Sequence, residues 1–336
     1  MKKNLLSLLI TIILTVQIIK LGFSNDENPN YKKGFYYLEK GEYDKAIEYL
    51  KKAEEEIKDD YNLYFELGNT YIRLDNVKEA LVYYERAYKL AKSKEEIFET
   101  AGVIAGLYYD QENPDSSLKF CEIALKNTQS TSDLIRIYSL FGLVYTQKEM
   151  YQEAITYFNK VISFDKSNDF AYYGLGKVYL KQKEYQKAIS EFKKAIEINP
   201  AYIKSHKFIS LSYYESEDYE KAIQHTERAL ELINDLPSTE RNKEKAKILN
   251  NYAWILLKAK DEKTKNPKKA LKYAQEVVYK LDDSYSEHWG TLAEAYYQNK
   301  MKDKAIEAVK KAIELEPDNQ EYKERLEKYN KSIDKK

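Results

Sequence analysis

Small and apolar side chains recur along the chain at a nearly fixed spacing, and this spacing predicts the architecture. The string Tyr-Asp-Lys-Ala-Ile at residues 43–47 returns almost unchanged at 151–155, 185–189 and 219–223. Aligning the chain on the small residue of this string gives Ala46, Ala80, Ser117, Ala154, Ala188, Ala222, Ala270 and Ala305. The steps between them are 34, 37, 37, 34, 34, 48 and 35 residues. A period in this range indicates a repeat protein in which each unit is one supersecondary element.

Two further sets of positions in each repeat fit the faces of helices. Twelve residues before the anchor stands another small residue: Gly34, Gly68, Ala105, Gly142, Gly176, Ser210 and Ala293. Three residues later comes a tyrosine: Tyr37, Tyr71, Tyr108, Tyr145, Tyr179, Tyr213 and Tyr296. These positions share one face of a first helix, and the anchor shares one face of a second helix with the residues four and seven positions later. The sequence therefore predicts an all-α fold, a right-handed α-solenoid of stacked helix-turn-helix hairpins with a concave groove.

This pattern resembles the tetratricopeptide repeat family, in which large, small and aromatic residues occupy the same places. Repeat five matches almost throughout, with Tyr172, Leu175, Gly176, Tyr179, Ala188, Phe192, Ala195 and Pro200. Repeat eight matches with Trp289, Leu292, Ala293, Tyr296, Ala305, Ala312 and Pro317. The resemblance implies eight repeats, at residues 27–60, 61–94, 98–131, 135–168, 169–202, 203–236, 246–284 and 286–319. It also implies a role in protein–protein interaction, although a fold alone names no partner.

Three segments depart from the repeat pattern. Repeat three has Ala101 and Cys121 where large residues are usual, which makes it the weakest match. Repeat seven has extra residues in its turn, around 260–265. We expect residues 236–245 to form a linker and to be the largest irregularity of the array. Residues 320–336 are expected to form a C-terminal capping helix and tail.

Residues 1–24 have the order of a signal peptide. Two lysines follow Met1, an apolar run of 15 residues extends from Leu5 to Ile19, and Gly22 and Ser24 stand where cleavage requires small residues. The run is shorter than the roughly 20 apolar residues of a membrane-spanning helix, so we predict cleaved export, with an uncleaved N-terminal membrane anchor as the alternative. No cysteine follows the run, which excludes a lipid-modified N-terminus. Together with a composition rich in Lys, Ile, Asn and Tyr, this favours a bacterial protein that is periplasmic, envelope-associated or secreted.

Charge and motifs argue against other classes of protein. The 55 basic residues balance 55 acidic ones, so no basic excess marks a nucleic-acid binder and no nucleic-acid partner is expected. One cysteine and three histidines form no zinc site of the usual spacing. The sequence contains no GxGxxG and no phosphate-binding GxxxxGKS or GxxxxGKT motif. We therefore predict no catalytic residues, no metal and no cofactor.

Isolated cysteine and histidine residues have structural interpretations. Cys121 lies on an apolar helical face and is expected to be buried and inert. His206 occupies a large-residue position of repeat six and is expected in the core. His225 and His288 lie in different repeats, so no pairing of histidine with carboxylate is predicted.

The resemblance further implies a partner-binding groove, formed by the first helix of each repeat. The candidate residues at the groove positions are Tyr31, Phe35, Phe65, Asn69, Tyr109, Tyr173, Lys177, Lys181, Lys204, Lys207, Tyr214, Asn250, Trp254 and Tyr297. This face is more aromatic than a solvated helix face requires, which favours a peptide or protein partner. The alternative is that the superhelix curls tightly and these side chains pack on one another.

Particular groove positions suggest particular ligands. The four lysines of repeats five and six would cluster and could meet an acidic peptide, or they form only a solvated helix face. Tyr31 and Phe35 stand where some family members use Lys and Asn to hold a C-terminal carboxylate, so that clamp is not expected. Asn69 occupies a place that the family often uses to bind a ligand backbone. Asn250 is a groove candidate too, or it caps a helix.

These observations together predict a non-catalytic, exported scaffold. It would bind a protein or peptide in its groove, in bacterial envelope assembly, secretion or complex organisation. Membrane contact is expected only through residues 1–24, if they are uncleaved. The alternative is a structural protein that self-associates by stacking its terminal repeats.

Overall fold

The computed structural model describes residues 28–331, and within this range the chain forms helices and turns with no β-strand. The chain divides into two compact units, one ending at Lys166 and the other beginning at Ser167. The predicted signal segment, residues 1–24, lies outside the described residues. Between residues 28 and 331 no helix combines the length and the apolar character needed to cross a bilayer.

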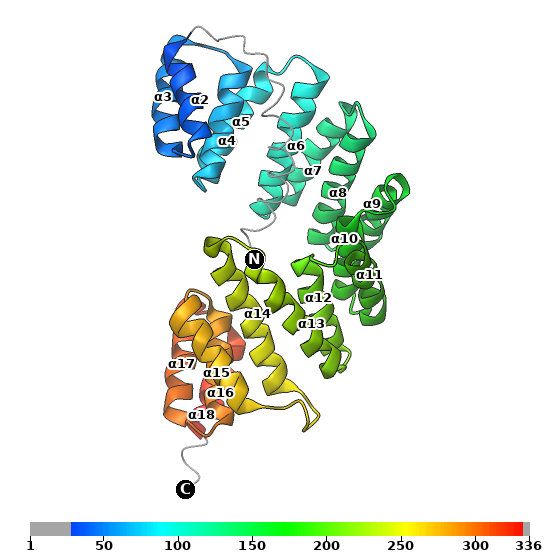
Figure 1. Cartoon of the computed structure of the whole chain (residues 1–336), viewed down its shortest axis with the longest axis vertical. Helices are drawn as coiled ribbons and strands as arrows, with labels where there is room; N and C mark the ends of the chain where they lie inside the picture. Colours follow the sequence, from blue (N-terminus) through cyan, green and yellow to red (C-terminus); the bar gives the residue numbers. More distant parts are fainter. Residues whose placement is uncertain (1–27, 332–336) are drawn as a thin grey trace. The chain divides into compact units, whose positions relative to one another are not determined.

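The first unit consists of four helix pairs (Figure 1). Its helices are α2 (Pro29–Glu39), α3 (Tyr43–Glu56), α4 (Tyr61–Arg73), α5 (Val77–Leu90), α6 (Lys94–Asp110), α7 (Pro114–Lys126), α8 (Thr131–Gln147) and α9 (Tyr151–Phe164). The two helices of each pair pack on each other, and the second helix of one pair packs on the first helix of the next. Each hairpin therefore buries its apolar face against a neighbour, as a repeat array requires.

The second unit continues the same scheme. Its helices are α10 (Asp169–Lys181), α11 (Tyr185–Ile198), α12 (Ile203–Glu215), α13 (Tyr219–Leu232), α14 (Ser238–Lys258), α15 (Pro267–Glu276), α16 (Ser286–Gln298), α17 (Lys302–Leu315) and α18 (Gln320–Lys331). Two short elements, η1 (Ile233–Asp235) and η2 (Val277–Leu281), follow α13 and α15. The last helix, α18, packs on α17. The predicted all-α solenoid of helical hairpins is confirmed.

Close approach of the two helices in a hairpin explains the small residues of the pattern. A Cβ atom added at Gly176 of α10 would lie 2.6 Å from the Phe192 ring of α11. The equivalent Cβ at Gly142 of α8 would lie 2.7 Å from the Phe158 ring of α9. The large residue of the second helix thus fills the space that the glycine of the first leaves free.

The short turns within the hairpins share one backbone conformation. One residue in each has a positive φ, close to the left-handed helical region: Gly41, Asp75, Glu112, Glu149, Lys183, Glu217 and Lys300. The next amide then bonds back to the first helix, as where Glu184 N donates to Tyr179 O at 2.8 Å. This is the hydrogen-bond pattern that commonly ends an α-helix and starts a tight turn.

Repeat seven departs from the regular hairpin. The predicted linker at residues 236–245 is wrong for most of its length. Residues 238–245 belong to α14, which begins directly after Pro237. The proline ring favours the start of a helix, and the guanidinium of Arg241 donates to the carbonyl of Leu236 at 2.8 Å. Irregular structure lies instead in the long turn between α14 and α15 and in η2, a π-helical turn of the kind often found where a helix accommodates an extra residue.

Candidate functional site

Basic side chains of α12 and α14 meet at one carboxylate, and a lysine of α10 lies near them. Lys207 of α12 donates through Nζ to Glu244 Oε2 at 2.6 Å, and Lys247 of α14 donates to Glu244 Oε1 at 3.1 Å. Lys204, one turn before Lys207, lies within electrostatic range of all three of these groups. Lys177 of α10 lies within range of Lys204. We call Lys177, Lys204, Lys207 and Lys247 the lysine cluster.

Lys177 differs from the other members because it has an aromatic environment. Its Nζ lies 5.8 Å from the centre of the Tyr173 ring and 5.7 Å from that of Phe208. Within residues 28–331 no carboxylate lies at ion-pair distance from it. Burial, together with the charges of Lys204 and Lys181, lowers the pKa of Lys177 to about 8.

Burial also shifts the other groups of the cluster. It lowers the pKa of Lys207, although the charge of Glu244 partly offsets the effect. Burial alone would raise the pKa of Glu244, but Lys207 and Lys247 hold it below its usual range. Glu244 is therefore ionised and engaged by two ammonium groups, and Lys204 has a second carboxylate, that of Glu240, within electrostatic range.

The sequence identified this cluster only in part. It groups Lys177, Lys181, Lys204 and Lys207; Lys181 and Lys204 both lie within electrostatic range of Lys177, and Lys181 is exposed at the end of α10. It missed Glu244 and Lys247. The sequence pattern predicts a linker at residue 244, so it gives no reason to expect this charge to face α12. A helical reading of 238–258 would have placed Glu244 and Lys247 one turn apart on one face.

Three predicted groove residues lie in the helix packing instead. Tyr31, Phe65 and Tyr173 are 4%, 2% and 2% exposed. The Phe65 ring packs edge-on against Tyr84 of α5, with ring centres 5.3 Å apart. For these three positions the alternative of mutual packing describes the structure, and they offer little surface to a partner.

The other candidates of the first unit are partly or fully engaged. Asn69 is buried, and its Oδ1 accepts a 2.6 Å hydrogen bond from the Tyr84 hydroxyl. Phe35 is half-buried and packs 4.8 Å from the Tyr31 ring. Tyr109 is half-buried at the end of α6, where its carbonyl accepts a hydrogen bond from Gln147 Nε2 at 3.2 Å.

Near the C-terminus, α18 covers predicted groove residues. The Tyr297 ring stacks on Tyr329 of α18, with ring centres 4.4 Å apart. Trp254 of α14 lies between two cations, with Lys258 Nζ 4.7 Å and the Arg325 guanidinium 5.1 Å from its ring centre. These contacts leave Trp254 and Tyr297 half-buried.

Two further candidates lie on α12 and α14. Tyr214 is half-buried, and its ring centre is 5.9 Å from that of Tyr219. Asn250 lies in the interior of α14, which excludes the helix-capping alternative because the helix begins at Ser238. Its buried Oδ1 accepts no hydrogen bond among the described residues.

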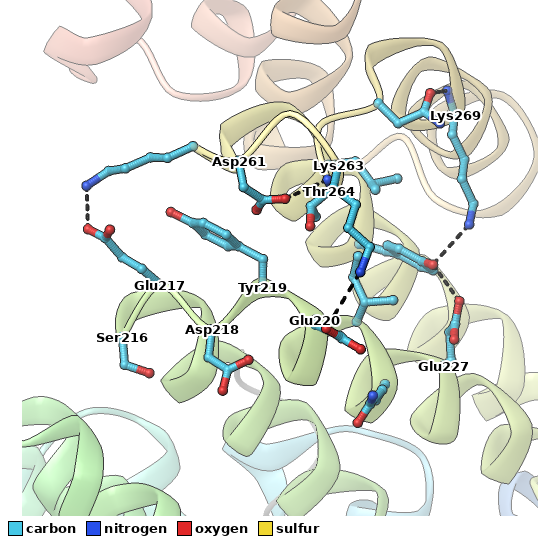
Figure 2. A pocket seen from close by; sticks show the side chains of 16 residues that line it. Ser216, Glu217, Asp218, Tyr219, Glu220, Glu227, Asp261, Lys263, Thr264 and Lys269 are labelled. Carbon is cyan, nitrogen blue, oxygen red and sulfur yellow. Dashed lines mark hydrogen bonds and ion pairs between the residues drawn. The ribbon is translucent and has the colours of Figure 1, made fainter.

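The long turn of repeat seven borders an open pocket that the sequence did not predict. The pocket has a volume of about 1070 Å³ and lies between α13, α14 and residues 260–266. Figure 2 shows Lys263 extending from the turn toward Glu220, with 3.9 Å between Nζ and Oε2, while Lys260 pairs with Glu217. Both pairs are well exposed, so they add little stability. At the other end of the pocket Tyr252 donates to Glu227 at 2.6 Å.

The histidine and cysteine positions are structural, with one contact that the sequence missed. His206 and Cys121 are 5% and 0% exposed, as predicted. His225, however, packs on His206 with 3.1 Å between their Nδ1 atoms. His206 Nε2 lies 3.2 Å from the carbonyl of Pro200, which can only accept. His206 therefore carries its proton on Nε2, and His225 donates through Nδ1.

Family models match three parts of the chain. Two models described as tetratricopeptide repeat match residues 37–87 and 289–319, and the model for anaphase-promoting complex, cyclosome, subunit 3 matches residues 147–229. These matches support a tetratricopeptide repeat protein. No curated protein matches the chain.

Solved structures with a similar fold include a tetratricopeptide repeat protein. Yeast Tom70 is 17% identical with a TM-score of 0.65, over 97% of this chain and 69% of that one. A tetratricopeptide repeat protein from Parabacteroides merdae is 16% identical with a TM-score of 0.57, over 90% and 97%. The human IFIT1 dimer with PPP-AAAA is 15% identical with a TM-score of 0.55, over 92% and 78%. At such identities the likeness shows the fold alone.

Proposed function

We propose that this tetratricopeptide repeat protein is an exported, non-catalytic scaffold that binds an acidic stretch of a protein partner at the lysine cluster. The observation that carries the proposal is Lys177, a half-buried lysine whose ammonium group has aromatic rings and other lysines around it and no carboxylate at ion-pair distance among the described residues. A charge that is partly removed from water is more stable when it is paired, so the group favours an anion that residues 28–331 do not supply.

The chemistry of the cluster favours carboxylates. Glu244 accepts hydrogen bonds from Lys207 and Lys247, and this contact supports carboxylates as ligands for neighbouring lysines. Charge-assisted hydrogen bonds of this kind are stronger than neutral ones. A partner carboxylate near Lys177 and Lys204 would offset the repulsion between these two ammonium groups.

Defined peptides test the anion preference. A fluorescent octapeptide of alternating Glu and Ser is titrated with the full chain, and the same peptide with Gln in place of Glu is the control. The Glu peptide should bind and the Gln peptide should bind at least about tenfold more weakly. Equal binding of both peptides would refute an anion site, and tighter binding of an oligoadenylate of equal charge would exclude a protein partner.

Variants locate the site on the chain. Lys177→Met and Lys204→Met remove charge from the cluster and preserve much of the apolar side-chain volume. Lys268→Met changes an exposed lysine of α15 and is the matched control. The two cluster variants should weaken the Glu peptide about tenfold, while the control should leave its affinity unchanged. If the cluster variants keep the wild-type affinity and Lys268→Met weakens it, the peptide binds elsewhere on the chain.

Export and an envelope role rest on residues 1–24, and they need tests in the native cell. The mass of the mature chain and its fraction distinguish the alternatives: a soluble chain that starts at Asn25 supports cleavage, and an intact chain in membranes supports an anchor. Cross-linking in the native envelope should then trap a stoichiometric partner with an acidic stretch. A mature chain that starts at Met1 in the cytoplasm would overturn the export proposal.

A further inference from the structure

One tyrosine of the repeat pattern is covered in repeat six and half-buried in the other repeats that have it. The second helix of a hairpin begins with a tyrosine in four repeats, at Tyr43, Tyr151, Tyr185 and Tyr219. The first three are half-buried, whereas Tyr219 is only 7% exposed. Tyr219 lines the open pocket together with the long turn of repeat seven, residues 260–266. The extra residues of this turn therefore help to cover a side chain that the regular hairpins leave accessible.

The hydroxyl group of Tyr219 has no hydrogen-bond partner among the described residues. Figure 2 shows its ring pointing toward the long turn, and no dashed line leaves the hydroxyl oxygen. The ring itself packs against Tyr214, with ring centres 5.9 Å apart. A tyrosine that is largely buried normally finds a partner for its hydroxyl. This hydroxyl therefore faces the pocket as a polar group that is available to a ligand.

Two carboxylates of the pocket also lack a counter-charge at ion-pair distance. Five carboxylates line the pocket, and three of them pair with lysines: Asp218 with Lys221, Glu217 with Lys260, and Glu220 with Lys263. The other two, Glu227 and Asp261, are in no ion pair within residues 28–331. Glu227 accepts a hydrogen bond from the Tyr252 hydroxyl at 2.6 Å. Asp261 accepts one from the amide of Thr264 at 2.7 Å, and Lys263 lies within electrostatic range of it.

Apolar surface separates these two carboxylates. Tyr219, Ile223 and Glu227 stand four residues apart, so they follow one face of α13. Glu227 lies about 12 Å along the helix from Tyr219, because an α-helix rises about 1.5 Å per residue. Figure 2 shows Asp261 at the Tyr219 end, and the buried Leu256 of α14 also lines the pocket. The pocket thus has an acidic group at each end and an apolar wall between them.

The lysines of the pocket hold these ends only loosely. Lys263 and Glu220 are both well exposed, with 3.9 Å between Nζ and Oε2. Lys269 donates to the Tyr252 hydroxyl at 3.0 Å and not to Glu227. Exposed ion pairs contribute little stability because water screens them. A cation that also covers the apolar wall can therefore compete with these lysines.

We propose that this pocket binds an aliphatic polyamine, with one ammonium group between Asp261 and the Tyr219 hydroxyl and another at Glu227. The ammonium groups donate to the two carboxylates, and the Tyr219 hydroxyl accepts one further hydrogen bond. The methylene groups between them lie on Ile223 and Leu256, as the stems of lysine side chains lie on apolar surface. A pocket of about 1070 Å³ accommodates a small ligand of this kind.

An organic cation fits better than a metal ion. Among residues 28–331 no group of three or more His, Cys, Asp or Glu side chains could hold a metal. The proposal goes beyond the function above, because it concerns the second helix of repeat six and the turn of repeat seven. Its ligand is a small cation and not a protein, and it uses no residue of the lysine cluster.

The test uses amines of known length and charge. Isothermal titration calorimetry of the full chain should give a dissociation constant below about 1 mM for spermidine. Diaminooctane should bind at least about tenfold more tightly than diaminopropane, which has the same charge but cannot reach both carboxylates. Octanediol, the neutral control, should give no heat of binding. If spermidine does not bind at about 10 mM, or if the two diamines bind equally, the proposal is wrong.

A peptide distinguishes a small amine from the lysine side chains of a protein partner. A pentapeptide of Gly with two lysines is titrated under the same conditions. It should bind more weakly than spermidine, because its backbone cannot lie on the apolar wall as methylene groups do. Tighter binding of the peptide would assign the pocket to a protein partner and overturn the polyamine proposal.

Variants locate the amine in the pocket. Tyr219→Phe removes only a hydroxyl without a partner, so the melting temperature should stay within about 2 °C while the affinity for spermidine falls at least about fivefold. Glu227→Gln and Asp261→Asn should each weaken spermidine about tenfold. Glu231→Gln, at an exposed carboxylate of α13 outside the pocket, is the matched control and should bind as the wild type does. Equal losses in all three acid variants would mean general charge attraction and no site.

The two proposals fail independently. Lys177→Met should leave spermidine bound as before, and Glu227→Gln should leave the Glu peptide bound as before. If spermidine binds and the Glu peptide does not, only the proposal for the lysine cluster falls. The opposite result removes only the polyamine site.

Discussion

Lys177 lies over the ring of Phe208, with 5.7 Å between its Nζ and the ring centre, and has no carboxylate at ion-pair distance in the part of the chain that the structure describes. The electrons of the ring face attract the ammonium group, but a ring replaces lost water only in part. Burial accordingly lowers the pKa of Lys177 to about 8. The charge is retained near neutral pH at a cost to folding.

Lys177→Met should therefore stabilise the protein at pH 7. The shift of the pKa from 10.5 to about 8 corresponds to at most about 3 kcal/mol of unfolding free energy. Between pH 8 and 10.5 the unfolded chain holds a proton at Lys177 that the folded chain has lost, so the wild type gains stability as the pH rises through this range. Denaturant unfolding at pH 7 and pH 10.5 measures the difference. The variant should have its largest advantage at pH 7.

Lys181→Met is the matched control for that measurement, because Lys181 is exposed on the same helix. It should change stability by less than about 0.5 kcal/mol at either pH. If Lys177→Met destabilises the protein at pH 7, its ammonium group has a partner that offsets burial, and the basis for an anion site is removed.

Repeat spacing was enough to predict the hairpins, because each hairpin solves the same packing problem in the same way. Where the two helices of a hairpin approach, a small residue such as Gly176 faces a large residue such as Phe192. This pairing of small and large residues is visible in the sequence. Cys121 of repeat three departs from this alternation, because a small buried residue stands where Phe158 and Phe192 stand in repeats four and five. The spacing of small and large residues therefore predicts each hairpin. The apolar face that a hairpin leaves uncovered predicts that the next repeat packs on it.

The candidate site could be predicted only in part, since it depends on contacts between repeats. Helical periodicity identifies the face on which Tyr173 and Lys177 lie, but not how far the next helix covers that face. Tyr173 is buried because Phe208 of α12 packs against it, with ring centres 5.6 Å apart. Glu244 was missed because a charged stretch after Pro237 looked like a linker, while its pairing with α12 supports the helix.

Acid should lower the unfolding free energy of the protein through the contact between His206 and His225. Burial, with the nearby charges of His206 and Lys193, lowers the pKa of His225 to about 4. Between pH 6.5 and about 4 the unfolded chain binds a proton at this residue that the folded chain does not, so the unfolding free energy falls as the pH drops through that window. His225→Asn keeps an N–H donor for His206 but does not titrate. Unfolding at a series of pH values should show a shallower loss in this variant, and an identical slope would contradict the assignment.

Gly176→Ala should destabilise the second unit. The new Cβ would lie 2.6 Å from the Phe192 ring, which is fully buried and cannot move aside freely. Overpacking of this kind costs about 1–3 kcal/mol. Thermal unfolding measures it, and the additional change Phe192→Leu should recover part of the loss because it makes room for the methyl group. A stability equal to wild type would show that the two helices of this hairpin are farther apart than 2.6 Å implies.

Arg136→Met should destabilise the first unit more than a surface ion pair would suggest. Arg136 and Glu99 join α8 to α6 by two hydrogen bonds, and their side chains are 19% and 12% exposed. Removing the arginine leaves a largely buried carboxylate without a counter-charge, which should cost about 2–3 kcal/mol. Adding Glu99→Gln to the variant removes that charge and should recover most of the loss. Chemical unfolding of the two single variants and the double variant measures the coupling; a double variant as unstable as Arg136→Met would mean that the lost packing of the arginine over Phe98, and not the unpaired charge, causes the effect.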